Sequence, residues 1–284
     1  MSETWRQRLL ACEQRLFDAQ LDKTMAKDLC RSVMGRLGTA FYLFLDEHLR
    51  DDQTQLMDSL EQRLLQGEPL AYVIGETNFF GLPLQVDSRV LIPRPETEEL
   101  VEWMLSNHPS EVLQVADVAT GSGNIALALK AHRPEWKVTG SDLSLDALTV
   151  ARNNGLRLGL EVQWLQGNLL DPHLQGGLKY HLIVANLPYV AYDDELQASV
   201  FRYEPHLALF ADHQGLALYE AFFAALPQVL ISGGDVYLEF GANQQEAIHQ
   251  RLNQFLPQME WEFRKDRFGR DRMVHLHSPI RASL

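Results

Sequence analysis

An asparagine, a proline and a tyrosine follow directly on an apolar run near the middle of the chain. Residues 182–185 read Leu-Ile-Val-Ala, and the next four are Asn186, Leu187, Pro188 and Tyr189. The side-chain carbonyl of Asn186 and the backbone carbonyl of Leu187, aimed by Pro188, could accept hydrogen bonds from a planar amide or base. Tyr189 could offer its flat face to the same group. Because such acceptors favour attack by a nitrogen, this pattern predicts chemistry at an amide or amino nitrogen.

A turn with two glycines occurs earlier, where a predicted strand meets a predicted helix. It covers residues 117–123 and reads Asp-Val-Ala-Thr-Gly-Ser-Gly. Such a turn lets a ligand approach backbone N–H groups closely. The turn matches the dinucleotide pattern Gly-x-Gly-x-x-Gly poorly, because Ala119 takes the first glycine position. A tight turn that serves packing alone is the alternative interpretation.

Asp142 lies about 20 residues after these glycines, at the end of the next predicted strand. An acid at this place in nucleotide-binding sheets accepts hydrogen bonds from ribose hydroxyls. Ser144 fits the N-cap of the following helix better, which leaves Asp142 for a ligand. Since the sequence lacks a phosphate-binding arrangement, the turn and the acid predict a nucleoside without a pyrophosphate, such as S-adenosyl-L-methionine.

Apolar strands and helical patterns alternate from about residue 110 onward. Strands are predicted at 112–119, 137–143, 181–186 and 234–241, and helices at 124–132, 145–159, 217–230 and 243–255. This alternation predicts a parallel sheet covered on both faces by helices. Ligands bind such sheets at the carboxyl ends of the strands, where Asn186 and Asp142 are expected.

The first part of the chain has a different pattern. Leucines and phenylalanines recur at helical spacing over residues 1–75, where we expect a small helical bundle with the apolar stripes as its core, used for docking: Leu9, Leu10, Leu16, Phe17 and Leu21. Residues 77–92 partly alternate and contain Gly81 and Pro83, which predicts a β-hairpin. We therefore divide the chain into a bundle (1–75), a hairpin linker (76–92) and a main domain (93–284).

Composition narrows the class of protein. The chain has 284 residues, of which 46% are hydrophobic and 22% charged, and its net charge is -13. This acidic balance argues against direct binding of nucleic acid. Cys12 and Cys30 are too few for a disulfide scaffold, and their spacing fits no zinc motif. Because neither a secretory signal nor a membrane-length apolar run is apparent, we expect a cytoplasmic protein with no membrane partner.

The Asn-Leu-Pro-Tyr motif resembles the [Asn/Asp]-Pro-Pro-[Tyr/Phe/Trp] signature of class I amino-methyltransferases. Residues 67–103 closely resemble the segment peculiar to the peptide chain release factor N5-glutamine methyltransferases, the PrmC/HemK family. The resemblance continues in four further segments, 142–154, 203–219, 233–244 and 266–274. Its most specific part is Pro-Arg-Pro-Glu-Thr-Glu, which the related ribosomal-protein enzymes usually lack. This favours release factors as the substrate.

The resemblance implies an α/β fold. A class I (Rossmann-like), seven-stranded methyltransferase domain would follow the helical bundle and the hairpin, with its last strand antiparallel. The methionyl end of S-adenosyl-L-methionine would contact the turn, and its ribose would contact Asp142. Its adenine would lie beside Asn168 or Leu169. The turn residues implied are Ala119, Thr120, Gly121, Ser122 and Gly123. Residues 93–95 would cover the cofactor, and Arg94 would reach a carboxylate or form a structural ion pair.

The resemblance also implies the reaction. The glutamine of the Gly-Gly-Gln motif in a release factor would enter a pocket formed by Asn186, Leu187, Pro188 and Tyr189. Its side-chain nitrogen would take the methyl group by direct in-line transfer, with S-adenosyl-L-homocysteine as the second product. Asn186 would lie beside the cofactor and hold the amide. No metal is needed, and we expect a monomer.

Three positions depart from the family pattern. Ala119 replaces the usual glycine, Asn168 a frequent aspartate, and Leu187 the first proline of the signature. Asn-Leu-Pro-Tyr is also what ribosomal RNA adenine dimethyltransferases tend to show, so amino methylation of RNA or DNA is the alternative activity. A binding module that keeps the cofactor without transfer is another.

Two features near the C-terminus have simpler interpretations. His275 and His277 alternate on a strand, and without a third ligand we expect them to be solvated rather than to bind a metal. Residues 263–272 form a basic cluster, which predicts either a solvated hairpin or a contact with the release factor or nearby ribosomal RNA.

Overall fold

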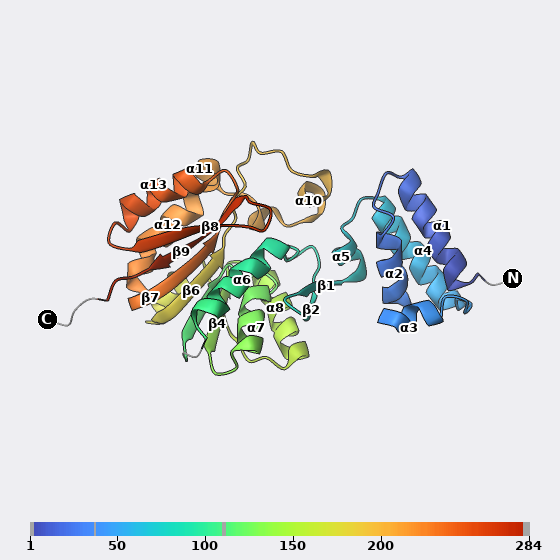
Figure 1. The fold of residues 1–284 in the computed structure, drawn as a ribbon, viewed down its shortest axis with the longest axis horizontal. Coiled ribbons are helices and arrows are strands. Elements are labelled where there is room, and N and C mark those ends of the chain that lie inside the picture. Colours follow the sequence, from blue (N-terminus) through green and yellow to red (C-terminus); the bar gives the residue numbers. More distant parts are fainter. Residues whose placement is uncertain (1–2, 37, 110–111, 281–284) are drawn as a thin grey trace. The chain divides into compact units, whose positions relative to one another are not determined.

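The computed structural model describes residues 3–36, 38–109 and 112–280. The chain forms two compact units, which Figure 1 shows as ribbons. The helical unit consists of Met1–Glu76 and Gln197–Tyr203, and the sheet unit consists of Thr77–Leu196 and Glu204–Leu284. The functional division into docking bundle, linker and catalytic domain stays a prediction.

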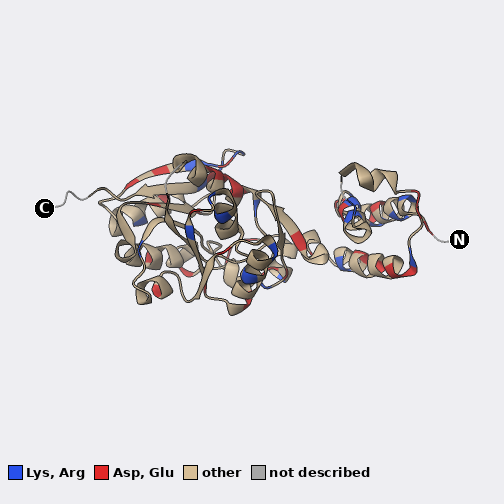
Figure 2. Ribbon diagram, turned by 90° about the horizontal axis from the view of Figure 1, so that it is seen from below, with Lys and Arg blue, Asp and Glu red and all other residues tan. Residues whose placement is uncertain are grey.

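Over its described residues, the helical unit contains five helices from the first part of the chain and one from near residue 200. The first five are α1 (Trp5–Asp18), α2 (Met25–Met34), α3 (Gly38–Leu43), α4 (Asp51–Leu65) and α5 (Leu70–Ile74). The sixth, α10 (Ala198–Tyr203), was not expected here, and the Tyr203 hydroxyl donates to the backbone oxygen of Gln66 at 3.0 Å. Figure 2 shows acidic and basic residues interspersed along the long helices of this unit.

Not every leucine of the expected stripe belongs to this core. Leu16 is fully buried, whereas Leu10 and Phe17 are 58% and 65% exposed. Successive residues of a helix point about 100° apart, so the neighbours Leu16 and Phe17 cannot both face the core. The prediction that Leu10 and Phe17 are core residues was therefore wrong.

The sheet unit contains a seven-stranded sheet in the order β5-β4-β3-β6-β7-β9-β8. Five strands are parallel: β3 (Gln114–Val118), β4 (Lys137–Asp142), β5 (Gln163–Gln166), β6 (Tyr180–Asn186) and β7 (Leu230–Glu239). β9 (Asp271–His277) runs antiparallel between β7 and β8 (Glu260–Lys265). The α/β class, the seven strands and the antiparallel last strand are confirmed.

Helices cover both faces of this sheet, as Figure 1 shows. The helices of the unit are α6 (Pro95–Asn107), α7 (Asn124–His132), α8 (Leu145–Leu158), α9 (Asp171–Gln175), α11 (Asp212–Gly215), α12 (Ala217–Ala225) and α13 (Gln245–Phe255). Along β6, Leu182 and Val184 join the core under α6 and α7, and Ile183 and Ala185 join the core under α12 and α13. Burial on both faces explains why β6 is a continuous apolar run.

Several element predictions need correction. β5, β8 and α9 were missed, because their sequences carry no continuous apolar run. The helix expected over 217–230 ends at Ala225, and Leu226–Gln228 form a 3-10 turn around Pro227, which has no backbone N–H to continue a helix. The hairpin is shorter than expected, with β1 (Glu76–Phe79) and β2 (Leu82–Gln85) only.

Candidate functional site

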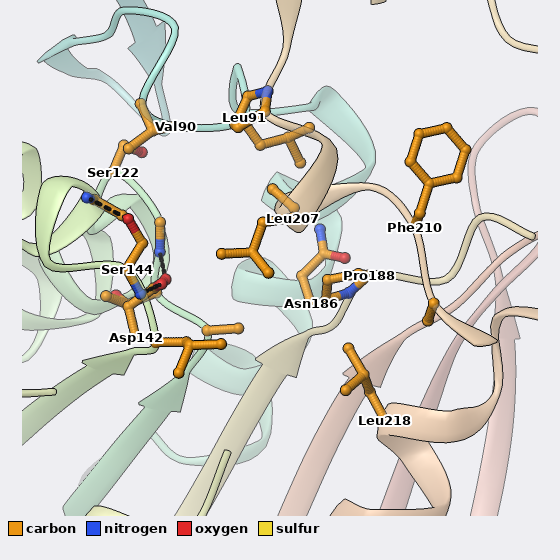
Figure 3. Close-up of a pocket in the computed structure, with 18 of the residues that line it drawn as sticks. Val90, Leu91, Ser122, Asp142, Ser144, Asn186, Pro188, Leu207, Phe210 and Leu218 are labelled. Carbon is orange, nitrogen blue, oxygen red and sulfur yellow. Dashed lines mark hydrogen bonds between the residues drawn. The ribbon is translucent and has the colours of Figure 1, made fainter. Parts of the chain in front are cut away.

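A cavity of about 280 Å³ opens at the carboxyl ends of β3, β4 and β6. Figure 3 shows part of its lining. Nine of the twelve predicted site residues line it: Ala119, Thr120, Gly121, Ser122, Asp142, Asn168, Leu169, Asn186 and Pro188. Gly123, Leu187 and Tyr189 are not in the lining. Residues far apart in the sequence therefore meet at one sheet edge, as the strand pattern predicts.

The turn after β3 uses left-handed backbone at three positions. Ala119, Gly121 and Gly123 have φ values of 60°, 54° and 81°. A side chain in this region costs about 1–2 kcal/mol, which Ala119 bears and a glycine would not. A Cβ on Gly121 would meet nothing within 4 Å, whereas one on Gly123 would lie 2.9 Å from the Trp164 ring. Gly121 thus borders open space, and Gly123 is required for packing.

Asp117 stabilises this turn through two hydrogen bonds. Its Oδ2 accepts from the Thr120 hydroxyl at 2.5 Å and from the Ala126 backbone N–H at 3.0 Å. Asp117 is fully buried, and burial raises the pKa of its carboxyl to about 7. Among the described residues, no hydrogen-bond donor reaches its Oδ1. The sequence pattern placed Asp117 in the turn but gave it no role.

Asp142 joins the turn to the next helix. Its Oδ2 accepts from the Gly121 N–H and its Oδ1 from the Ser144 N–H, each at 2.9 Å (Figure 3). Ser144 caps α8 by accepting from the Ala147 N–H, which confirms the expected N-cap. Asp142 is thus less free than expected, although each oxygen keeps a lone pair. Burial raises the pKa of its carboxyl despite these hydrogen bonds.

Asn168 and Leu169 lie in the short loop between β5 and α9. The N–H of Gly167 donates to the backbone oxygen of Asp142 at 3.0 Å, which holds this loop beside the end of β4. Both Asn168 and Leu169 line the cavity. The adenine contact expected for them stays a prediction.

Asn186 is the last residue of β6, and Glu239 is its register partner on β7. The Asn186 Nδ2 donates to the Thr97 hydroxyl at 3.2 Å, and this hydroxyl donates to Glu239 Oε2 at 2.7 Å. Burial raises the pKa of the Glu239 carboxyl to about 7. Thr97 and Glu239 were not among the predicted site residues. The only signal for Thr97 was its place in the family-specific Pro-Arg-Pro-Glu-Thr-Glu segment.

Leu187 and Tyr189, which also belong to the motif, are more buried than expected. The Leu187 side chain is 1% exposed, and the Tyr189 ring is half-buried against the core. The Gln244 side chain donates to the Tyr189 backbone oxygen at 2.9 Å. Burial raises the pKa of Tyr189 to about 12, so the phenol is neutral at physiological pH. In this structure Pro188, rather than the Tyr189 ring, faces the cavity.

Part of the cavity rim is apolar, and this part was missed by the sequence pattern. Tyr192, Leu207 and Leu143 line it and are 71%, 58% and 49% exposed. Tyr192 stacks on Phe210 with ring centroids 5.2 Å apart and an interplanar angle of 12°. Large apolar side chains left in water at a cavity mouth indicate a contact surface for a ligand or a partner.

Arg94 forms the structural ion pair that was one of its two expected roles. Its Nη2 lies 2.6 Å from Glu204 Oε1, and Glu204 Oε2 accepts from the Ile92 N–H. Glu204 is 4% exposed. The pair ties residues 92–94 to the segment that continues into the cavity rim.

The expectation for His275 and His277 was wrong in part. Both rings lie within hydrogen-bond distance of Asp235 Oδ1, at 2.7 and 2.9 Å, so they are paired rather than simply solvated.

Among the described residues, no group of three or more His, Cys, Asp or Glu side chains could hold a metal ion. Likewise, no helix in the described part of the chain is long and apolar enough to cross a membrane.

Comparisons with known proteins define the class. The family model described as "Methyltransferase domain" matches residues 115–203, and the PrmC N-terminal domain model matches residues 7–75. The crystal structure of a methyltransferase from Pyrococcus furiosus, 17% identical, aligns with a TM-score of 0.54 over 78% of this chain and 100% of its own, which shows the shared fold. By fold and domain the chain is a methyltransferase of the class that uses S-adenosyl-L-methionine.

Full-length relatives give the particular family. The release factor glutamine methyltransferase of Streptococcus pneumoniae is 40% identical over 247 residues, which cover 86% of this chain and 88% of that protein. The enzyme of the same name from Lactococcus lactis is 39% identical over 230 residues, with coverages of 80% and 84%. The chain belongs to the release factor glutamine methyltransferase family, which confirms the resemblance seen in residues 67–103.

Proposed function

We propose that this chain methylates the side-chain amide nitrogen of the glutamine in the Gly-Gly-Gln motif of peptide chain release factors. One observation carries the proposal: Asn186 lies at the end of β6 and lines the cavity, and no donor of the described residues reaches its Oδ1. Asn186 is partly buried, so this oxygen can accept a hydrogen bond from a ligand in the cavity. The N–H groups of a glutamine amide are such donors.

The residues at the strand ends fit S-adenosyl-L-methionine. The carboxylate of Asp142 can accept from ribose hydroxyls, and Gly121 leaves open space for the methionyl end. The Ser122 hydroxyl is buried, lacks a hydrogen-bond partner among the described residues and lines the cavity. Asn168 and Leu169 border the space left for an adenine. When bound, this cofactor supplies an electrophilic methyl group.

The protein's part in the reaction is to bind and orient the acceptor nitrogen. Asn186 Oδ1 and the Leu187 carbonyl accept its two N–H groups, which directs the nitrogen lone pair toward the methyl group. The nitrogen takes the methyl directly and then releases a proton to solvent, so neither a covalent enzyme intermediate nor a metal is required. Pro188 fixes the backbone that carries the second acceptor.

A protein substrate fits the cavity rim. Tyr192, Leu207 and Leu143 surround the mouth with exposed apolar area, which suits a loop of another protein. The net charge of -13 opposes a nucleic-acid substrate. These features support a release factor loop over RNA as the acceptor.

Mass spectrometry of a purified release factor, incubated with the protein and S-adenosyl-L-methionine, tests the proposal. We expect a gain of one methyl group that maps to the glutamine of Gly-Gly-Gln. The matched control is a release factor in which this glutamine is replaced by glutamate. Methylation at another residue, or of ribosomal RNA in place of the release factor, would overturn the proposed substrate.

A further inference from the structure

Two side chains outside the predicted site hold the carboxamide of Asn186. Its Nδ2 donates to Thr97 Oγ1 at 3.2 Å, and its register partner on the neighbouring strand is Glu239. Thr97 Oγ1 in turn donates to Glu239 Oε2 at 2.7 Å. Thr97 and Glu239 are each 1% exposed. The three side chains form a network, a hydrogen-bonded chain that ends at the cavity.

Three separate elements build this network. Asn186 and Glu239 are paired residues at the ends of neighbouring parallel strands, so their side chains lie side by side. Thr97 comes from the first turn of α6, which begins at Pro95. The Tyr219 hydroxyl donates to the Glu239 backbone oxygen at 2.6 Å and fixes the end of β7. Because each element belongs to the core, the network has little freedom to rearrange.

The network determines which way the Asn186 amide points. The Thr97 hydroxyl has one proton and donates it to Glu239, so toward Asn186 it can only accept. Above about pH 7, the value to which burial raises its pKa, the Glu239 carboxylate is ionised and also only accepts. Both neighbours therefore require the NH2 group of Asn186, and Oδ1 is left for a ligand. A flipped amide would place its oxygen against two acceptors.

We propose that Thr97 and Glu239 are positioning residues that fix Asn186 with its oxygen toward the acceptor, and that they thereby select glutamine over glutamate. The proposal rests on the proposed function. A fixed oxygen attracts the NH2 end of a carboxamide and repels its oxygen end, which directs methylation to nitrogen. It also repels a glutamate carboxylate, which has acceptors only.

Thr97→Val is the primary test because it keeps the shape and removes the hydroxyl. We expect kcat to fall roughly 10- to 100-fold, since the amide can then flip away from the productive orientation. Affinity for S-adenosyl-L-methionine, measured by calorimetry, should change by less than about 3-fold, since Asp142 and the turn are intact. Thr97→Ser retains the hydroxyl and should restore most of kcat.

Thr54→Val provides the matched control. Thr54 lies on α4 in the helical unit, and its hydroxyl donates to the Arg50 backbone oxygen at 3.2 Å. The same chemical change at this position should leave kcat as in the wild type. Glu239→Gln is the second variant; its side chain can donate as well as accept, so an intermediate loss of kcat is expected.

A merely structural role for Thr97 predicts a different result with the glutamate form of the release factor. In the wild type, this form should inhibit weakly because Asn186 Oδ1 repels its carboxylate. In Thr97→Val the amide can turn its NH2 group toward the carboxylate, so inhibition should become stronger while kcat falls. Parallel weakening of both substrate and inhibitor binding would contradict the positioning role.

Side-chain amide NMR tests the network without any methyl transfer. The Asn186 NH2 resonances, assigned by their loss in Asn186→Ala, should shift and exchange faster with solvent in Thr97→Val than in Thr97→Ser. Unchanged resonances in Thr97→Val, or wild-type kcat in that variant, would overturn the proposal. If the wild type methylates no glutamine, the proposed function fails, and the NMR result still decides whether Thr97 and Glu239 orient Asn186.

Discussion

Glu61 of the helical unit and two buried carboxylates beside the cavity in the sheet unit are stabilised in opposite ways. In the helical unit, Glu61 is 3% exposed and forms ion pairs with Arg8 and Arg15. In the sheet unit, Asp117 and Glu239 are at least as deeply buried, yet neither forms an ion pair within the described part of the chain. They accept hydrogen bonds from hydroxyl and backbone groups instead, and burial raises both pKa values to about 7.

The difference separates a stabilising network from a functional one. A buried carboxylate with two arginines is neutralised, and its replacement mainly affects folding. A buried carboxylate beside a cavity without a paired cation is costly to keep, and such groups concentrate at functional sites. Asp117 holds the turn that borders the cavity, and Glu239 holds Asn186. The predictions below test whether substitutions at the site lower activity more than stability, and whether replacement of Glu61 in the helical unit lowers stability more than activity.

The largest effect is expected at the site itself. Asn186→Ala should lower kcat for methylation of a release factor by about 100-fold or more, because the acceptor amide loses its side-chain partner. The temperature of unfolding should change little, since Asn186 lies at a strand end and makes no core contact with its oxygen. Initial rates and a thermal melt on the same preparation check this. Near-normal turnover would remove Asn186 from the reaction.

The converse result is expected in the helical unit. Glu61→Gln removes the buried counterion of Arg8, whose side chain is 8% exposed, and leaves it the more exposed Asp58 and Glu3. The free energy of unfolding of this unit should fall by on the order of 3 kcal/mol. Below the new melting temperature, kcat should equal that of the wild type. Urea denaturation and initial rates measure the two quantities, and a large loss of kcat in the folded variant would break the distinction between the units.

Asp117 and Glu239, the two buried carboxyls of the sheet unit whose pKa is raised to about 7, should make stability depend on pH. Their ordinary pKa values are 3.8 and 4.5, and burial raises both to about 7 in the folded protein. A raised pKa contributes stability that is fully present below the unfolded value and is lost as pH rises through the folded value. The charged and titratable groups around Glu239 are Arg272, Glu96, Tyr189 and Tyr219.

Glu239→Gln removes one of these titrations and so isolates its contribution. Relative to the wild type, the variant should become progressively more stable between pH 5 and pH 8. The comparison cancels other groups, such as His173, whose pKa burial lowers to about 4. Glu61→Gln, measured in the same way, tests whether the effect is specific to the sheet unit. A stability difference for Glu239→Gln that is constant over this range would show that Glu239 is ionised throughout.

The sequence predicted the parts of this site that depend on strand ends and on motif residues. Asn186, Asp142 and the turn around Gly121 follow buried apolar runs, and parallel strands bring such ends to one edge. Thr97, Glu239 and the rim residue Tyr192 were missed. Their roles depend on which strands are neighbours and on how the segment after β6 folds back over the cavity, and neither is visible in hydrophobic periodicity. β5 and β8 were missed for a related reason, since their half-exposed residues resemble those of loops.

The smallest effect is expected at the cavity rim, where the residue to be replaced is exposed and is not one of the buried carboxylates. Tyr192→Ala should raise KM for a release factor roughly 3- to 10-fold, because it removes exposed aromatic area that stacks on Phe210. Since Tyr192 is 71% exposed, the free energy of unfolding should be almost unchanged. Tyr42→Ala, at a similarly exposed tyrosine of the helical unit, is the control. An equal rise in KM for both variants would indicate that both units contact the release factor, and an unchanged KM for Tyr192→Ala would remove the rim from the binding surface.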